Sequence, residues 1–316
     1  MQEQTYTVYI DGAVGTTGLQ IGQRLAAQPG IEVLQLDEAN RKELPARLKA
    51  VAKADVSILC LPDDAARELA AAAPADAKII DASTAHRTLP SWAYGFAELK
   101  GRRSKIAGSS RVAVPGCYAT GFLALAAPLV EAGALPASAT LFCHAVSGYS
   151  GGGKQMIAGY EHLERPLEYD APRQYALTLG HKHLPEMQAI AGLAAPPVFC
   201  PIVADYYSGM LVSLPLDIAQ LNAGWQSGAK LAEYFADYYA GEKLITVHPA
   251  GAAPEDGMLA ANTLSGRDTL EIFTLGNDRQ LLLAARLDNL GKGAAGAAVQ
   301  CMNLVLGREE VAGLKL

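Results

Sequence analysis

The sequence lacks the features that mark zinc-binding, disulfide-rich or membrane proteins. Its five cysteines are odd in number and far apart, and no CxxC pair occurs, so neither a metal site nor a disulfide framework is indicated. No apolar run reaches the roughly 18 residues that a membrane-spanning helix needs. The first residues, MQEQTYT, are polar and do not resemble a signal peptide. We therefore expect a cytoplasmic protein with free thiols and no bound metal.

A strong excess of charge of one sign is also missing. The formal net charge is −6, which argues against non-specific binding to nucleic acid. Half of the residues are hydrophobic and 18% are charged, a composition typical of folded globular proteins. A chain of 316 residues is long enough for two domains and a large core. The expected partner is therefore a small molecule rather than nucleic acid or membrane.

The first third of the chain alternates between strand-like and helix-like segments. Strands are predicted at residues 6–10, 31–36, 56–61 and 78–81, with helices at residues 17–28, 42–51 and 63–73 between them. A β-α-β-α-β-α-β order is typical of a doubly wound, parallel α/β sheet of the Rossmann type.

From residue 139 the pattern changes. Longer and irregularly spaced strands are predicted at residues 140–146, 198–204, 210–215, 244–247 and 269–275, separated by loops rich in glycine, proline and asparagine. We expect a second, α+β domain with a mixed or antiparallel sheet and flanking helices. Apolar residues at helical spacing predict a closing helix at residues 293–306.

The segment GAVGTTG follows the first strand and precedes the first helix. Its glycines have GxxGxxG spacing, in which Gly12 and Gly15 allow a tight turn and Gly18 allows close packing of the helix on the strand. The N–H groups of Thr16 and Thr17 would then face the pyrophosphate of a dinucleotide. The alternative is an ordinary turn between strand and helix.

Charged residues follow the second predicted strand. An acidic residue there, such as Asp37, is typical of NAD binding because it holds the ribose diol. Arg41 and Lys42 follow closely, and two cations there match the 2′-phosphate of NADP. We predict NADP(H) as the cofactor, with a solvated helix start as the alternative.

The segment VPGCYATG places a cysteine where a strand gives way to a helix. Cys117 follows the apolar residues 112–114 and precedes a helix-like run at residues 122–130. Free N–H groups and the helix dipole at such a position favour the thiolate, so we predict that Cys117 is a catalytic nucleophile. A thiol and a hydride carrier in one chain indicate reduction of an activated acyl group, or its reverse, through a thioester. Buried structural roles are expected for the other cysteines, Cys60, Cys143, Cys200 and Cys301.

A catalytic thiol needs an acid/base, and HKHLPEM supplies two candidates. His181 and His183 precede a helix whose first residue is predicted to be Pro185. The two histidines are expected to point to opposite sides of the segment, so that only one of them faces Cys117. We favour His183, which lies closer to the helix start. His144 and His248 are weaker candidates.

Two further segments are candidate anion sites. SGYSGGGK, residues 147–154, has GxxxxGK spacing but lacks the Ser or Thr that would hold magnesium in a P-loop. Its Ser147, Gly148 and Lys154 are therefore assigned to a smaller anion, the substrate phosphate or carboxylate. The loop of Ser83, His86 and Arg87 follows the strand at residues 78–81 and is expected to meet cofactor or substrate phosphate.

Together these segments resemble the N-acetyl-gamma-glutamyl-phosphate reductases, in their short second type. The resemblance extends over nearly the whole chain and includes IDASTAHR at Ile80, HAVSGYSGGGK at His144 and LDNLGKGAAGAAVQ at Leu287, besides the segments above. It implies that Cys117 is the nucleophile, that HKHLPEM carries the acid/base, and that Asn289 and Gly291 belong to a loop near the nicotinamide. It also implies NADPH-dependent reduction of N-acetylglutamyl phosphate in arginine biosynthesis.

The resemblance further implies the domain organisation and the assembly. We expect a Rossmann domain at residues 1–115, a catalytic domain with a dimerisation sheet at residues 116–286, and a C-terminal segment, residues 287–316, that returns to the Rossmann domain. A homodimer or homotetramer is expected. Two alternatives stay open: an aspartate-semialdehyde dehydrogenase-like enzyme of the same superfamily, and a catalytically silent NADP-binding regulator.

Overall fold

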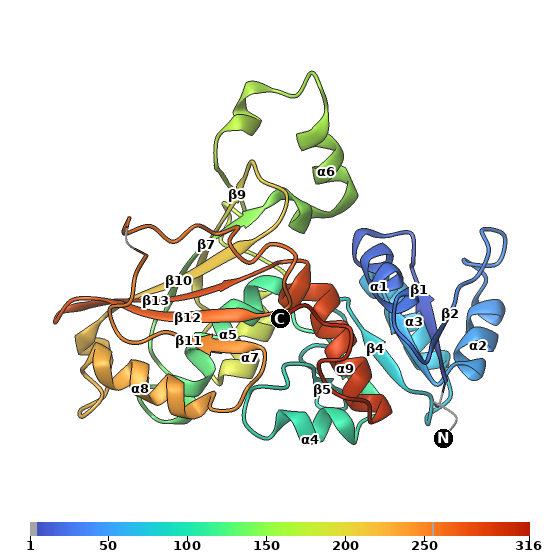
Figure 1. The fold of residues 1–316 in the computed structure, drawn as a ribbon, viewed down its shortest axis with the longest axis horizontal. Coiled ribbons are helices and arrows are strands. Elements are labelled where there is room, and N and C mark those ends of the chain that lie inside the picture. The colour runs from blue at the N-terminus through green and yellow to red at the C-terminus, as the bar shows by residue number, and fades with distance from the viewer. Residues whose placement is uncertain (1–4, 255) are drawn as a thin grey trace. The chain divides into compact units, whose positions relative to one another are not determined.

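The chain divides into two compact units. The computed structural model describes residues 5–254 and 256–316 (Figure 1). Unit 1 takes the described residues up to Gly116 together with Ala294–Leu314, and unit 2 takes Cys117–Gly293 with Lys315–Leu316. The chain therefore enters unit 1 twice and unit 2 twice.

Unit 1 is built on a six-stranded sheet in which all neighbouring strands are parallel. Its order is β2-β1-β3-β4-β6-β5, so the chain moves outward from β1 in both directions, as in a doubly wound fold. The strands are β1 (Tyr6–Asp11), β2 (Ile31–Leu34), β3 (Val56–Leu59), β4 (Ile79–Asp81), β5 (Ala93–Tyr94) and β6 (Arg111–Ala113).

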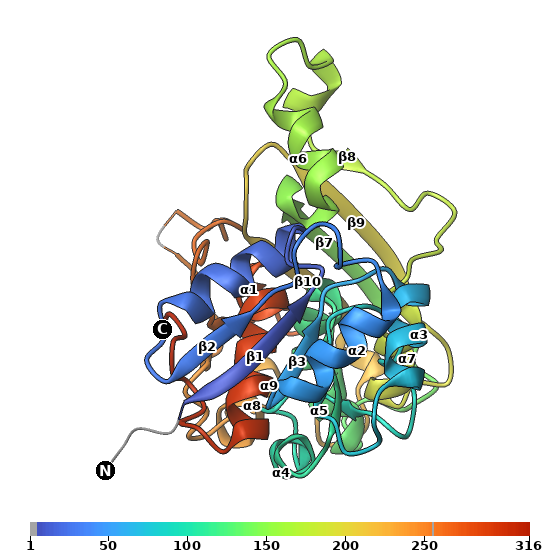
Figure 2. The same cartoon turned by 90° about the vertical axis from the view of Figure 1, so that its right-hand side faces the viewer.

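Helices cover both faces of this sheet (Figure 2). Val8, Ile10 and Ile58 point to one face, where they pack with α1 (Thr16–Ala26), α4 (Arg102–Ala107) and α9 (Gly296–Leu306). Tyr9 and Leu59 point to the other, toward α2 (Leu44–Lys53) and α3 (Asp63–Ala72). The alternation of side chains along each strand explains this division.

Unit 2 contains a seven-stranded mixed sheet of order β11-β12-β13-β10-β7-β9-β8. Strand pairs β11–β12 and β7–β9 are parallel and the other pairs are antiparallel. The strands are β7 (Phe142–Gly148), β8 (Arg173–Gln174), β9 (Val198–Ala204), β10 (Met210–Asp217), β11 (Ile245–Val247), β12 (Leu270–Gly276) and β13 (Gln280–Leu287).

One long helix, α5 (Cys117–Glu131), lies on this sheet and is buried over most of its length. A Cβ at Gly121 would lie 2.6 Å from Cγ2 of Val212, so glycine lets the helix approach β10 closely. Helix α7 (Leu184–Ala191) packs on α5, and α8 (Gly228–Tyr238) packs on β12. A lobe with α6 (Gly153–Glu161) follows β7.

The predicted fold class is confirmed: unit 1 is a parallel Rossmann-type sheet and unit 2 carries a mixed sheet. Strand β13 was missed because LLLAARL is apolar at every position except Arg286 and shows no period-2 alternation. Its place between β10 and β12 buries it on both faces. The closing helical segment, predicted at residues 293–306, consists of a π-helical turn at Gly291–Ala295 followed directly by α9 at Gly296–Leu306.

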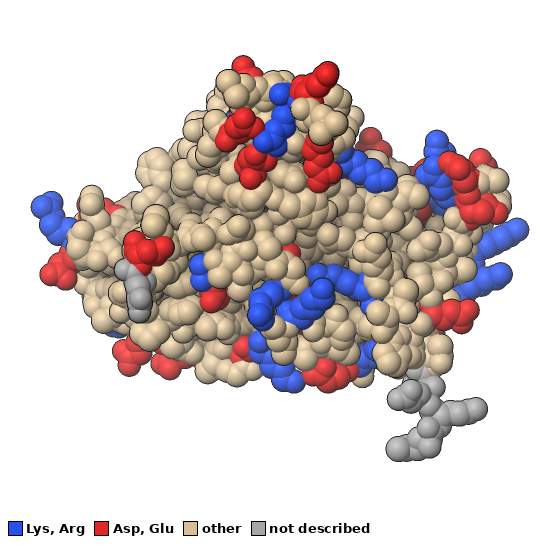
Figure 3. All heavy atoms as spheres, turned by 45° about the horizontal axis from the view of Figure 1, so that its top comes forward, with Lys and Arg blue, Asp and Glu red and all other residues tan. Residues whose placement is uncertain are grey.

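Two surface properties bear on possible partners. On the face drawn in Figure 3, acidic and basic side chains are interspersed. Within residues 5–254 and 256–316, none of the helices has the length and apolar character required to cross a bilayer.

Candidate active site

The glycine loop of unit 1 has the geometry that a dinucleotide phosphate site requires. Gly12 has a positive φ of 82°, and a Cβ there would lie 2.2 Å from the carbonyl oxygen of Cys60. A Cβ at Gly18 would lie 2.4 Å from the Gly12 oxygen. Both positions therefore need glycine, one for backbone conformation and one for close packing of α1.

The N-terminus of α1 leaves donors available. Gly15 precedes the helix without a side-chain cap, and the first intrahelical bond runs from the Leu19 N–H to the Gly15 oxygen. The N–H groups of Thr16, Thr17 and Gly18 have no acceptor among the described residues. These donors and the helix dipole fit the pyrophosphate of a dinucleotide.

The predicted specificity residues lie in a turn between β2 and α2. The Asp37 carboxylate accepts hydrogen bonds from the Asn40 backbone N–H and from its Nδ2, both at 2.9 Å. Arg41 forms a surface ion pair with Glu38 at 3.1 Å, and Lys42 is exposed. Asp37 thus stabilises the turn that presents the two cations.

The loop after β4 is held by buried contacts with Asp81. The Ser83 hydroxyl donates to Asp81 at 2.6 Å, and Nδ1 of His86 lies 2.6 Å from the same carboxylate oxygen. Arg87 donates to the carbonyl of Val114 at 2.9 Å and to that of Ala82. These contacts give the predicted residues a role in fixing the loop and the strand end that precedes Cys117.

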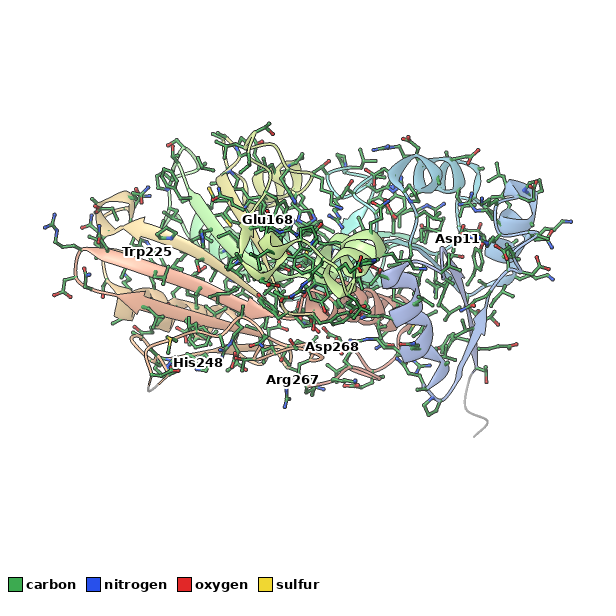
Figure 4. The ribbon with its side chains drawn as sticks, turned by 90° about the horizontal axis from the view of Figure 1, so that it is seen from above. Asp11, Glu168, Trp225, His248, Arg267 and Asp268 are labelled. Atoms are coloured by element: carbon green, nitrogen blue, oxygen red, sulfur yellow. The ribbon has the colours of Figure 1, made fainter. Side chains whose placement is uncertain are left out.

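A buried ion pair, which the sequence analysis missed, lies beside the glycine loop. Nε of Arg47, from α2, donates at 2.7 Å to Asp11 at the end of β1, a residue labelled in Figure 4. Burial raises the pKa of Asp11, and the Arg47 guanidinium opposes that rise. No sequence motif joins these two positions.

In unit 2, Cys117 is the first residue of α5 and is partly exposed. A Cβ at Gly293 would lie 2.8 Å from the Cys117 Cβ, so the segment DNLGKG passes directly beside the thiol. The positive end of the α5 dipole stabilises a thiolate at this position. The other four cysteines form no disulfide either. Burial raises the pKa of Cys60 to about 12 and raises that of Cys143 further.

Both histidines of HKHLPEM pack near the residue that follows Cys117. The rings of His181 and His183 lie 5.9 and 6.0 Å from the Tyr118 ring and 4.8 Å from each other. The expectation that they point to opposite sides was wrong. Residues two apart in an extended segment share one face, and this segment is not extended, since His183 has φ −87° and ψ −12° and α7 begins at the next residue.

The two histidines have different environments. His183 is buried, whereas His181 is partly exposed. Nδ1 of His181 accepts the backbone N–H of His183 at 3.2 Å, which leaves the proton of the neutral ring on Nε2. Burial, assisted by the charge of Lys182, lowers the pKa of His181 to about 4. At neutral pH His181 is therefore an uncharged hydrogen-bond donor.

A pair of tyrosines, Tyr118 and Tyr175, lies beside the two histidine rings. The Tyr175 hydroxyl donates to the Tyr118 hydroxyl at 2.8 Å, and burial raises both pKa values. The loop that connects Tyr175 to His181 contains two non-glycine residues with positive φ, Ala176 and Leu179. Tyr118 is visible in the cysteine motif, but no sequence signal marks Tyr175.

Residues 147–154 are only partly available to an anion. The N–H groups of Gly148, Tyr149 and Ser150 donate to the carbonyls of residues 209, 206 and 207, and the Ser147 hydroxyl donates to the Gly148 oxygen. The backbone N–H groups in this part of the segment are therefore not available to an anion, contrary to the assignment of Gly148 to the substrate anion. The exposed Lys154, in the first turn of α6, offers a charge.

Asn289 joins three segments of unit 2. Its Oδ1 accepts the Gly209 N–H at 2.8 Å, and its Nδ2 donates to the Ser150 hydroxyl at 3.0 Å. A Cβ at Gly291 would lie 1.9 Å from the Arg267 carbonyl oxygen. Both predicted nicotinamide-loop residues thus fix the DNLGKG segment beside Cys117.

Known protein families match the sequences of both units. The family model described as "Semialdehyde dehydrogenase, NAD binding domain" matches residues 7–108, and "Semialdehyde dehydrogenase, dimerisation domain" matches residues 117–289. The N-acetyl-gamma-glutamyl-phosphate reductase 2 of a Nostoc species is 46% identical over 318 residues, covering 97% of this chain and 98% of the relative. The N-acetyl-gamma-glutamyl-phosphate reductase of Brucella anthropi is 46% identical over 95% of this chain and 98% of its own.

Solved structures match at the level of the fold. The aspartate semialdehyde dehydrogenase II of Vibrio cholerae superposes with a TM-score of 0.69 at 15% identity, over 96% of this chain and 99% of that chain. Aspartate semialdehyde dehydrogenase from Francisella tularensis gives a TM-score of 0.69 at 11% identity, over 96% of this chain and 100% of that chain.

The environment of His181 predicts a pH dependence of stability. Its pKa falls from 6.5 in the unfolded chain to about 4 in the folded protein. As the pH drops through this window the unfolded state takes up a proton that the folded state does not, so stability is lost. We expect His181→Gln to flatten the fall in melting temperature between pH 6.5 and 4. An unchanged slope in the variant would contradict the depressed pKa.

Proposed function

Because the chain belongs to the N-acetyl-gamma-glutamyl-phosphate reductase family of semialdehyde dehydrogenases, we propose that it reduces N-acetyl-L-glutamyl 5-phosphate to N-acetyl-L-glutamate 5-semialdehyde and phosphate in arginine biosynthesis. The observation that carries this proposal is identity of 46% over almost the full length of both chains. The thiol at the start of α5, with two histidines near Tyr118, supports the chemistry.

The first step is formation of a thioester. The Cys117 thiolate attacks the acyl carbon, the C–S bond forms, and the C–O bond to phosphate breaks. The helix dipole of α5 favours the thiolate that this step requires. Lys154 is suited to bind the phosphate or the carboxylate of the substrate, because it is exposed in the first turn of α6.

The second step reduces the thioester and restores the thiol. NADPH, when bound, supplies the hydride that converts the thioester to a thiohemiacetal. His183 protonates the developing alkoxide and then takes the hydroxyl proton back as the C–S bond breaks, which releases the aldehyde and the Cys117 thiolate. His183 suits this role better than His181, because the Nδ1 of His181 is already occupied and its pKa of about 4 lies far from neutral pH.

His181 is assigned a different role in the same site. As a neutral ring with its proton on Nε2, it can donate a hydrogen bond to the substrate carbonyl oxygen without giving up the proton. The Tyr118–Tyr175 pair and the edge contact with Phe199 hold its ring in place.

The cofactor fits the residues of unit 1. Unit 1 matches an NAD-binding domain, and the N–H groups of Thr16 and Thr17 would hold the pyrophosphate. We assign the 2′-phosphate of NADP to Arg41 and Lys42, which the Asp37 turn presents beyond β2. Ser83, His86 and Arg87 then act by shaping the loop after β4.

A second copy of the chain is proposed to cover the open face of the unit 2 sheet. Opposite α5 and α8, strands β7, β9 and β10 present Phe142, Val146, Ile202 and Leu211, all at least partly exposed. The matching family model is a dimerisation domain, which supports this assignment. Light scattering that gave a monomer mass at micromolar concentration would contradict it.

The two alternative functions are less well supported. Aspartate semialdehyde dehydrogenases share the fold with this chain at identities of only 11% to 15%, which carries no substrate assignment. A silent regulator would not need both Cys117 and the histidine pair. The activity test is direct: the semialdehyde, NADP and phosphate are mixed with the enzyme, and NADPH formation is followed by absorbance. Turnover of aspartate semialdehyde, but not of N-acetylglutamate semialdehyde, would contradict the proposal.

Cys117→Ser is expected to lose nearly all turnover and to retain NADPH binding, because a serine hydroxyl is not ionised at neutral pH. The measurements are steady-state turnover and fluorescence titration with NADPH. Cys200→Ser, at a partly buried cysteine in β9, is the matched control and should keep normal turnover. A Cys117→Ser enzyme within a few-fold of wild type would disprove the thioester route.

His183→Gln is expected to lower turnover by about two orders of magnitude, the usual size of an acid/base contribution. NADPH binding should survive, and the loss should show as the disappearance of one limb of the pH–turnover profile. His181→Gln, which keeps an N–H donor, should act mainly on KM and keep both limbs. The reverse result would move the acid/base assignment to His181.

Replacing Arg41 and Lys42 together by alanine is expected to raise the Kd for NADPH by at least tenfold and to leave that for NADH nearly unchanged, because only NADPH carries the 2′-phosphate. Lys49→Ala, on the exposed part of α2, is the control. Equal losses for both cofactors would show that the two cations do not read the 2′-phosphate.

A further inference from the structure

A buried ion pair joins the end of β1 to the start of α2 in unit 1. Nε of Arg47 donates to the Asp11 carboxylate at 2.7 Å, and the two side chains are only 6% and 3% exposed. Asp11, labelled in Figure 4, is the last residue of β1, and Arg47 lies near the start of α2. The pair therefore connects two segments that the cofactor is proposed to contact.

A gain in stability does not explain why this pair is charged. Removing two charges from water costs about as much free energy as their attraction provides, so replacing a buried ion pair by apolar residues is often neutral or stabilising. Burial raises the pKa of Asp11 although Arg47, the Tyr9 hydroxyl and the Gly12 N–H oppose the rise. Nη2 of Arg47 is buried and has no hydrogen-bond partner among the described residues. What the pair supplies is a fixed distance and direction between two segments.

On the Asp11 side, the fixed segment is the glycine loop. Asp11 directly precedes Gly12, whose φ of 82° opens the loop. The Cys60 N–H donates to the Asp11 carbonyl at 2.8 Å, which ties the same strand end to β3. The loop then leads to the N–H groups of Thr16 and Thr17, which we assign to the pyrophosphate. Asp11 is thus anchored at the strand end from which the pyrophosphate site begins.

On the Arg47 side, hydrogen bonds run back to the turn between β2 and α2. The Arg47 N–H donates to the Glu43 carbonyl, and the Glu43 N–H donates to the Asn40 carbonyl, both at 3.0 Å. The Asn40 N–H donates to the Asp37 carboxylate at 2.9 Å, and the Arg41 N–H donates to the Asp37 carbonyl at 3.0 Å. An unbroken series of hydrogen bonds therefore leads from the Asp11 carboxylate to the turn that carries Arg41.

The start of α2 depends on this pair for its position. Glu43 precedes the helix without a side-chain cap, and Arg47 is the first buried residue of the helix. The buried apolar contacts come later, where Ala50 and Val51 pack with Tyr9. The ion pair is therefore the buried contact nearest to the turn between β2 and α2.

We propose that Asp11 and Arg47 are positioning residues for the cofactor. Their ion pair sets the spacing between the N–H groups assigned to the pyrophosphate and the cations assigned to the 2′-phosphate, and so determines the preference for NADPH over NADH. This inference rests on the proposed function, which assigns those two sites. Without the pair, the turn that carries Arg41 and Lys42 shifts relative to Thr16 and Thr17. NADPH must reach both sites, whereas NADH lacks the 2′-phosphate and does not depend on their spacing.

The test is the ratio of the Kd for NADH to the Kd for NADPH, measured by fluorescence titration of the full-length protein. Asp11→Asn combined with Arg47→Met replaces the pair by uncharged side chains. This double variant should lower the ratio by about fivefold or more, because a misplaced 2′-phosphate loses charge-assisted hydrogen bonds. The ratio cancels effects on the pyrophosphate site, which both cofactors share. A merely structural role would lower the melting temperature and leave the ratio unchanged.

Glu271→Gln is the matched control. It breaks another buried ion pair, in which Nε of Arg286 donates to Glu271 at 2.7 Å in unit 2. The melting temperature of this variant should fall, and its ratio of Kd values should equal that of the wild type. A lowered ratio in Glu271→Gln would show that loss of stability alone changes the preference, and would overturn the proposal.

Two further variants test the mechanism. Arg47→Lys keeps a cation within reach of Asp11 and should keep the preference for NADPH. In a protein that already carries Arg41→Ala and Lys42→Ala, removal of the pair should lower the ratio no further, because the cations that it positions are gone. Should the Asp11→Asn, Arg47→Met protein not fold, Arg47→Met alone takes its place with the same expected ratio, since the unpaired Asp11 carboxylate can take up a proton.

The outcomes separate this proposal from the assignments on which it rests. A ratio that falls in Arg41→Ala, Lys42→Ala but not on removal of the ion pair would overturn the positioning role and leave the cofactor assignment standing. A ratio unchanged in Arg41→Ala, Lys42→Ala would overturn both. The reductase activity is tested separately, by turnover of the semialdehyde, because these titrations contain no substrate.

Discussion

The close seating of α5 on the unit 2 sheet is the constraint on which the candidate catalytic centre depends. The helix is buried along most of its length, and Gly121 allows it to approach β10 within a distance that excludes a Cβ. Because α5 cannot shift without breaking this packing, the position of its first residue, Cys117, is fixed relative to β10 and β13. Gly293 approaches Cys117 almost as closely, since a Cβ there would lie 2.8 Å from the Cys117 Cβ. Close backbone packing of α5 and of the DNLGKG segment therefore fixes the position of the Cys117 thiol.

The different roles that we propose for the two histidines follow from backbone geometry. One turn of chain carries both rings, and the backbone N–H of His183 occupies Nδ1 of His181. That single hydrogen bond fixes the tautomer of His181, while burial and Lys182 keep it uncharged. His183 is buried and lies where α7 begins. Two chemically identical side chains are thereby suited to different proposed roles. His181 would donate a hydrogen bond, and His183 would exchange a proton.

Glycine serves a different purpose in each unit. In unit 1, Gly12 and Gly18 bring β1, β3 and α1 so close together that helix N–H groups are presented to a phosphate. In unit 2, Gly148 permits close contact between the end of β7 and the backbone of residues 206–207. The N–H groups of Tyr149 and Ser150 donate to carbonyls there and are no longer available to an anion. The same residue type, in two glycine-rich motifs, therefore creates an anion site in one case and removes most of one in the other.

By itself the sequence determined the alternating α/β order of the first third, the mixed sheet of the second part, the glycine loop, and the thiol at a strand-to-helix turn. These follow from local periodicity and turn chemistry, which short segments carry. Strand β13 could not be found, because a strand buried on both faces has no alternation. Only the tertiary structure decided that His181 and His183 turn the same way, that Tyr175 reaches Tyr118, that Arg47 pairs with Asp11, and that Asn289 ties Ser150 to Gly209. Most of these contacts join residues far apart in the chain, and the contact between the two histidines depends on local backbone angles. Neither kind of contact produces a pattern along the sequence.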